Sequence, residues 1–202
     1  MDLQEWDNII SIISNSVTAL SVFGGVIFSG SKLKDYLDKK NKEVSFNAAL
    51  SLYDEITLFR GKLTQIRIKL NYAIEVIKES FDTQKPLSPT KYIELQEIGI
   101  IAFETSLIIG NLFIKTNNFN AIFNDKSLEK VTKLVEITNE ITAQINNFFN
   151  CLIISSKGKV ITMEEFKILY MYSNKYDEFS QEYLKACTAI QQTKFEEFCK
   201  FK

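Results

Sequence analysis

Residues 9–30 read IISIISNSVTALSVFGGVIFSG, and they form the centre of an uncharged run that extends from residue 8 to residue 31. At a rise of about 1.5 Å per residue, a helix over 9–30 spans roughly 33 Å, which matches a hydrocarbon core about 30 Å thick. A helix also satisfies its own backbone hydrogen bonds, as a lone crossing segment must. The stretch therefore predicts an N-terminal transmembrane helix that carries one large domain on one side of the bilayer.

Two other interpretations of this stretch stay open. A buried core helix is also apolar, and several polar residues lower the hydrophobicity here: Ser11, Ser14, Asn15, Ser16, Thr18 and Ser21. A cleaved signal peptide begins with basic residues, but residues 1–7 contain three acids and no base. Length favours the membrane-spanning helix over both alternatives.

Charged residues on the two sides of the run predict its orientation. Three acids precede the run, whereas a basic flank follows it: Lys32, Lys34, Lys39, Lys40 and Lys42. Nearby acids offset three of these five lysines. Because lysine accumulates on the cytoplasmic side, we expect a single-pass protein of the inner (plasma) membrane, with residues 1–7 outside and the large domain in the cytoplasm.

One side of the predicted transmembrane helix carries small residues at spacings of three and four: Ser11, Ser14, Thr18, Ser21 and Gly25. Small residues let membrane helices approach closely, and hydroxyl groups can bond across the contact. This small-residue face predicts a homo-oligomer formed through the transmembrane helix. In the alternative interpretation, the hydroxyls bond only to carbonyls of their own helix.

Composition excludes several function classes. The chain has 24 basic and 25 acidic residues, without the basic excess of a general nucleic-acid binder, and we expect no direct nucleic-acid site. Histidine is absent, which removes Ser-His-Asp and Cys-His catalysis. Only Arg60 and Arg67 can offer bidentate contacts to phosphate. Phosphate loops and dinucleotide motifs are also absent. We therefore expect no enzyme activity, no cofactor and no metal site.

The remaining 171 residues are long enough for a sizeable core and contain few helix breakers. After a charged connector at 32–43, apolar residues recur every three or four positions over a helix predicted at 44–80: Ala49, Leu52, Ile56, Phe59, Leu63, Ile66, Leu70, Ala73 and Ile77. Residues 82–89 contain two prolines and predict a loop, in which Ser88 caps the next helix and Pro89 occupies its first turn.

That next helix is expected to reach Lys115, and its segment 98–114 holds a single charge, Glu104. A second membrane crossing is one interpretation. The segment is short for that purpose, and a carboxylate in lipid is costly. We therefore favour a central helix of the domain that is buried on most sides.

The asparagine-rich stretch 116–127 predicts a loop, whose apolar residues fold over the core or form a docking patch: Phe119, Ile122 and Phe123. A third helix is predicted to stop near Gly158 and carries a second seam: Val131, Leu134, Thr138, Ile141, Ile145, Phe148 and Leu152. A capping box at Thr162 and Glu165 starts the last helix. That helix is expected to continue toward the C-terminus, with a stripe at Phe166, Leu169, Tyr172, Tyr176, Phe179, Tyr183 and Ile190.

These patterns predict an all-α protein with an N-terminal single transmembrane helix followed by a cytosolic antiparallel four-helix bundle. The expected parts are a transmembrane segment at 1–31, a charged juxtamembrane connector at 32–43 and a helical bundle domain at 44–202. Three widely spaced cysteines, Cys151, Cys187 and Cys199, suit a reducing cytosol and are expected to be small buried side chains.

The stretch VFGGVIFSGSKLKDYLDKK at 22–40, joined to an all-helical cytosolic part, resembles small bacterial anti-phage effectors. These include the transmembrane proteins encoded beside retron reverse transcriptases. The resemblance implies a membrane-damaging role in abortive infection, restrained by a cytosolic partner. That partner would be a reverse transcriptase with its RNA–DNA product.

Two functions follow as expectations. In the first, release by a cytosolic protein lets the transmembrane helices associate and disrupt the bilayer. In the second, the protein is a membrane-tethered adaptor that presents a helical protein-binding bundle and does no damage. A soluble bundle that uses residues 9–30 as a core helix is a third interpretation. Architecture alone does not choose among them.

Overall fold

The computed structural model describes the backbone of residues 3–119 and 121–200, and the side chains of residues 38–119 and 121–199. Within that part of the chain, helices dominate and one pair of two-residue strands is present, which confirms the predicted all-α class. The chain divides into two compact units, Met1–Val44 and Ser45–Lys202.

The first unit contains the beginning of helix α1, which spans Leu3–Thr83. The predicted transmembrane stretch at 9–30 and its small-residue face lie outside the residues with described side chains. The same is true of Lys32 and Lys34. The other three lysines of the basic flank, Lys39, Lys40 and Lys42, are exposed.

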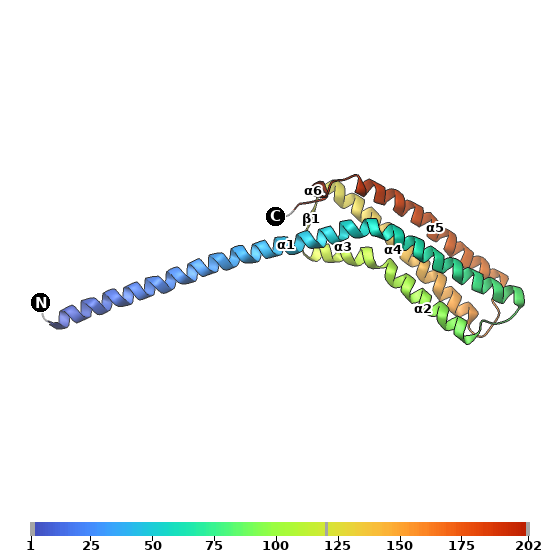
Figure 1. Cartoon of the computed structure of the whole chain (residues 1–202), viewed down its shortest axis with the longest axis horizontal. Coiled ribbons are helices and arrows are strands. Elements are labelled where there is room, and N and C mark those ends of the chain that lie inside the picture. The colour runs from blue at the N-terminus through green and yellow to red at the C-terminus, as the bar shows by residue number, and fades with distance from the viewer. Residues whose placement is uncertain (1–2, 120, 201–202) are drawn as a thin grey trace. The chain divides into compact units, whose positions relative to one another are not determined.

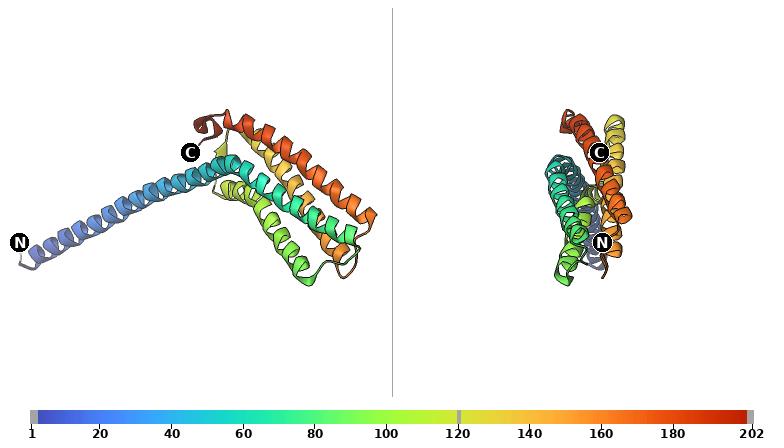
Figure 2. Two further views of the ribbon diagram at one scale, coloured as in Figure 1. Left: turned by 45° about the vertical axis from the view of Figure 1, so that its right-hand side comes forward. Right: turned by 90° about the vertical axis from the view of Figure 1, so that its right-hand side faces the viewer.

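The second unit begins inside α1 at Ser45 and holds the remaining elements. These are α2 (Pro89–Ser106), α3 (Ile108–Asn118), β1 (Ile122–Phe123), α4 (Asp125–Ser156), α5 (Met163–Gln191), α6 (Phe195–Phe198) and β2 (Cys199–Lys200). Helix α4 packs against α5, α2 and α3. The part of α1 that follows residue 45 lies beside α5 and beside α2–α3 (Figure 1, Figure 2).

The core of this unit is built from the two seams that the sequence predicts. All nine seam residues of α1 and all seven seam residues of α4 are at most 4% exposed. Burying a large apolar side chain contributes about 1.5–3 kcal/mol, so these two rows supply much of the driving force for folding. The seam predictions are confirmed.

Two buried tyrosines of α5 tie that helix to α1. The hydroxyl of Tyr176 donates a hydrogen bond of 2.6 Å to the carbonyl oxygen of Leu63, and that of Tyr183 donates one of 2.8 Å to Ile56. Burial raises the pKa of Tyr183 well above its usual range. The phenol therefore stays a neutral donor, and its polar group is satisfied inside the core.

Helix ends follow the local sequence. The Ser88 hydroxyl accepts from the amide of Lys91 at 3.3 Å, and Pro89 begins α2. Thr162 and Glu165 form the predicted capping box at the start of α5. Gly158 follows the end of α4 with φ at +68°, a backbone conformation that glycine adopts without steric cost. These boundary predictions are confirmed.

The end of the chain differs from the prediction of a continuing last helix. Helix α5 stops at Gln191, and the chain turns back so that β2 pairs antiparallel with β1. The return places Phe198 in the core at 1% exposure, edge-on to Phe123. A straight helix would not make this contact, and the gain from burying Phe198 explains the turn.

The stretch 116–127 is only partly a loop, because α3 extends to Asn118 and α4 begins at Asp125. Its three apolar residues were expected either to fold over the core or to form a docking patch, and they differ in burial. Phe123 is buried at 7% exposure, whereas Phe119 and Ile122 are 40% and 39% exposed. Along α5, Leu169, Tyr176, Tyr183 and Ile190 are buried, while the other three residues of the predicted stripe are half-buried.

Candidate functional site

The inner side of α2 and α3 is made largely of small or hydroxyl-bearing residues. The buried positions are Leu95, Gly99, Ala102, Ser106, Ile109 and Thr116. The buried hydroxyls are satisfied, since Ser106 donates to the carbonyl of Phe103 at 2.6 Å and Thr116 to that of Leu112 at 2.7 Å. Larger residues at the edges of this side, Ile98, Phe103, Leu112 and Phe113, are partly buried and pack against the core.

Gly99 marks the closest approach in this seam. A Cβ atom at this position would lie 2.8 Å from the ring of Phe149 on α4. Real Cβ atoms do not come that close to another heavy atom, so the contact between α2 and α4 requires glycine.

The outer side of the same helices carries the large residues. Ile93, Ile100, Leu107 and Ile114 recur every seventh position, and the three isoleucines are 53%, 57% and 58% exposed. Ile101 beside them is 48% exposed. These helices therefore carry large apolar residues on the outside as well as on the inside, whereas the usual helix of a water-soluble domain is polar on its outer side. We call this outer side the α2–α3 apolar face.

This arrangement corrects the prediction that residues 98–114 form a helix buried on most sides. Within Pro89–Asn118, only 22% of the most apolar 18-residue window is buried, and its mean hydropathy is 1.6. The segment also breaks at Leu107, whose amide bonds to the carbonyl of Glu104 instead of continuing the α-helical pattern. Among the residues whose side chains are described, Pro89–Asn118 is the one helical stretch long and apolar enough to cross a membrane.

Polar residues interrupt the α2–α3 apolar face at the same period of seven. Glu97, Glu104 and Asn111 are all exposed. At the centre of a bilayer a carboxylate such as that of Asp costs about 2.5–3.5 kcal/mol, whereas an Ile or Leu returns about 0.3–0.6 kcal/mol. Ionised Glu104 alone therefore cancels the gain from the four apolar residues of the row. The face suits the membrane interface, or the bilayer interior once Glu104 is neutralised.

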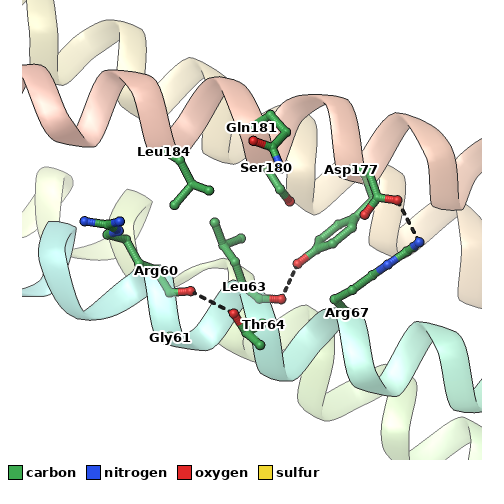
Figure 3. A pocket seen from close by; sticks show the side chains of 10 residues that line it. Arg60, Gly61, Leu63, Thr64, Arg67, Asp177, Ser180, Gln181 and Leu184 are labelled. Atoms are coloured by element: carbon green, nitrogen blue, oxygen red, sulfur yellow. Dashed lines mark hydrogen bonds and ion pairs between the residues drawn. The ribbon is translucent and has the colours of Figure 1, made fainter.

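A second candidate is a groove between α1 and α5, with a volume of about 490 Å³. Figure 3 shows that Arg60 and Arg67 on α1 point toward opposite ends of it, with Leu63 and Leu184 between them. These are the two arginines of the whole chain. We call this feature the α1–α5 groove.

The two arginines differ in their partners. The guanidinium of Arg67 lies 2.7 Å from the Asp177 carboxylate and 2.6 Å from the Ser173 hydroxyl. Arg60 donates a long bond of 3.5 Å to the side-chain oxygen of Gln191, a neutral group. Among the described residues, Arg60 has no ion pair with a carboxylate. The Arg60 end of the groove is therefore the end with an uncompensated positive charge.

Asp177 holds Arg67 only weakly. Burial raises the pKa of Asp177, although Arg67 beside it acts in the opposite direction. Both side chains are more than a third exposed, and such pairs contribute about 0–1 kcal/mol.

Other chemistry has few candidates in the described residues. No group of three or more Cys, Asp or Glu side chains is placed to hold a metal ion there. Cys187 and Cys199 are buried and Cys151 is half-buried, as expected for small core side chains. The α2–α3 apolar face was visible in the sequence as isoleucines seven residues apart, whereas the α1–α5 groove required knowledge of which helix lies opposite α1.

Comparison with known protein families, curated proteins and solved structures finds no match to this chain. Its function is therefore inferred from these two surfaces and from the sequence.

Proposed function

We propose that this protein is a membrane-anchored helical effector without catalytic activity. In this proposal, residues 9–30 cross the inner membrane, the second unit forms an antiparallel four-helix bundle in the cytoplasm, and the α2–α3 apolar face is a second surface for the bilayer. The single observation that carries the proposal is the row of exposed isoleucines on α2 and α3, which lies opposite a buried side that contains Gly99, Ala102, Ser106 and Thr116.

The proposed mechanism uses the weakness of the α2–α3 seam. Four of its six buried positions are small or hydroxyl-bearing residues, and in this proposal α2–α3 separates from α4 more readily than α1 separates from α5. Bilayer contact would then bury the isoleucines that water now surrounds. A cytosolic partner that covers this face would restrain the protein, and its release would allow the membrane helices to associate through Ser11, Ser14, Thr18, Ser21 and Gly25.

The resemblance to retron-associated transmembrane proteins supplies the context of the proposal. On this resemblance we propose a role in anti-phage defence, with a reverse transcriptase and its RNA–DNA as the restraining partner. The exposed lysines Lys39, Lys40 and Lys42 are compatible with anionic headgroups beside the anchor.

A membrane-tethered adaptor is the second candidate, and the alternation along the α2–α3 apolar face favours it. Ile93, Glu97, Ile100, Glu104, Leu107, Asn111 and Ile114 follow the three-and-four spacing of a helix seam. A partner helix that presents apolar and basic residues in the same alternation would match this row. In this function the face binds a protein and the bilayer stays intact.

Induced expression of the full chain in a bacterium, read by uptake of an impermeant dye, tests the effector proposal. The double variant Ile100→Asn/Ile114→Asn should abolish dye uptake, because it removes two apolar contacts from the α2–α3 apolar face. Ile68→Asn is the matched control, since Ile68 is an isoleucine of α1 that is 62% exposed. It should behave as wild type.

Dye uptake that persists unchanged in the double variant would remove this face from the mechanism. An intact membrane with the wild-type chain, including after phage infection of the expressing cells, would leave the adaptor as the function.

A further inference from the structure

We propose that the α1–α5 groove binds a phosphate monoester that carries an apolar body, with the phosphate at Arg60 and the body over Leu63 and Leu184. This inference is independent of the membrane role, because it depends on side chains of α1 and α5 alone. Figure 3 shows the residues involved.

The first argument is the placement of arginine. A chain of 202 residues contains two arginines, and both line the same groove. The guanidinium group presents several donors in a fixed plane and recognises phosphate more specifically than lysine does. The charge of Arg67 is balanced by the Asp177 carboxylate at 2.7 Å, whereas Arg60 contacts the neutral side chain of Gln191, so the anion belongs at Arg60.

The second argument is Gly61, which lines the groove in the interior of a helix. A Cβ atom at Gly61 would meet nothing within 4 Å. Packing against other helices therefore does not require glycine here, unlike at Gly99. Glycine in a helix is destabilising, and it is used where a ligand approaches the backbone closely. In this proposal, the apolar body of the ligand occupies the open space beside Gly61.

Uncharged polar side chains also line the groove, and they include Ser180, whose side-chain oxygen is buried. Ser180 lines the groove together with the hydroxyl-bearing Thr64 and the amide-bearing Gln181. These uncharged groups can bond to polar atoms on the rest of the ligand.

Size and polarity fit a small molecule. The groove volume of about 490 Å³ lies within the range of about 300–1,000 Å³ for small-molecule sites, which are mostly apolar with a few polar groups. A phosphate monoester of this kind has two sources in a cell: the headgroup of an acidic lipid and a soluble nucleotide. Both present the same chemistry to Arg60.

Calorimetric titration of the full chain in a neutral detergent tests the inference. The probes are dihexanoyl phosphatidic acid, adenosine monophosphate and inorganic phosphate. We expect at least one of the two monoesters to bind with a Kd below about 1 mM, and more tightly than inorganic phosphate. Binding of the lipid alone would assign a headgroup site, and binding of the nucleotide alone would assign a soluble ligand.

Three variants locate the binding. Arg60→Ala should weaken the monoester about tenfold or more, and Arg60→Lys should restore part of the loss. Gly61→Ala should weaken it severalfold while raising the Tm, an opposite pair of effects that a purely structural role would not produce. Lys185→Ala, a charge change on α5 outside this groove, should leave binding unchanged. No binding by either monoester, or binding unaffected by both Arg60→Ala and Gly61→Ala, would overturn the proposal.

Discussion

Two glycines in the helices of the second unit show how one residue type serves opposite purposes. Gly99 is required by packing, because a Cβ there would lie 2.8 Å from the Phe149 ring. Gly61 has open space around it and costs about 1 kcal/mol relative to alanine in a helix. Replacing each glycine by alanine therefore separates the effect of side-chain packing on stability from the effect of helix propensity.

Gly99→Ala should destabilise the chain. Overpacking costs about 1–3 kcal/mol and the alanine returns about 1 kcal/mol of helix propensity, so the net loss is up to roughly 2 kcal/mol. Gly61→Ala should stabilise by about 1 kcal/mol. Thermal unfolding followed by circular dichroism measures both. A Gly99→Ala variant that melts as high as Gly61→Ala would contradict the close contact with Phe149.

The helices themselves could be predicted from sequence, and so could the buried faces of α1 and α4, but the buried side of α2 and α3 could not. In α1 and α4 most large apolar residues occupy one side, so their spacing identifies the buried face. In α2–α3 large apolar residues occupy both sides, with Leu95 and Ile109 inside and Ile93, Ile100 and Ile114 outside, and hydropathy does not distinguish the two. The return of the chain after Gln191 was missed because it depends on the contact of Phe198 with Phe123. The α1–α5 groove was missed because sequence spacing does not show which helix faces Arg60 and Arg67.

The capping box at the start of α5 predicts a pH dependence. The side chain of Lys159 and the amide of Thr162 bond to Glu165 and lower its pKa from 4.5 to about 2. Because the pKa is lower in the folded chain, the charged form stabilises the fold above pH 4.5, and this contribution is lost as the pH falls toward 2. The contacts are largely solvent-exposed, so the contribution stays below about 1 kcal/mol.

Glu165→Gln keeps the shape of the capping box and removes the charge. Wild type should be the more stable chain at neutral pH, and the difference in free energy of unfolding should shrink from pH 4.5 to about pH 2. Denaturant titrations over this range measure it. A difference that stays constant with pH would show that the charge of Glu165 has no role in capping.

At the scale of the whole molecule, two stretches of the chain are apolar enough to contact or cross a membrane. One, at 9–30, was predicted from the sequence. The other is Pro89–Asn118, in which the structure shows Ile93, Ile100, Ile101 and Ile114 exposed. In the part of the chain whose side chains are described, both arginines line one groove. No group of side chains there is placed to hold a metal ion. The proposed membrane-anchored effector accounts for the two apolar stretches, and the α1–α5 groove is a separate proposal.

The central claim is that the α2–α3 apolar face contacts lipid, and tryptophan quenching tests it most directly. In a Trp6→Phe background, which removes the one native tryptophan, Ile100→Trp and the control Ile68→Trp are placed separately in the full chain and reconstituted into vesicles with brominated lipids. We predict that Trp at position 100 is quenched and its emission is blue-shifted, while Trp at position 68 is not quenched. Equal, unquenched emission from both positions would contradict the claim.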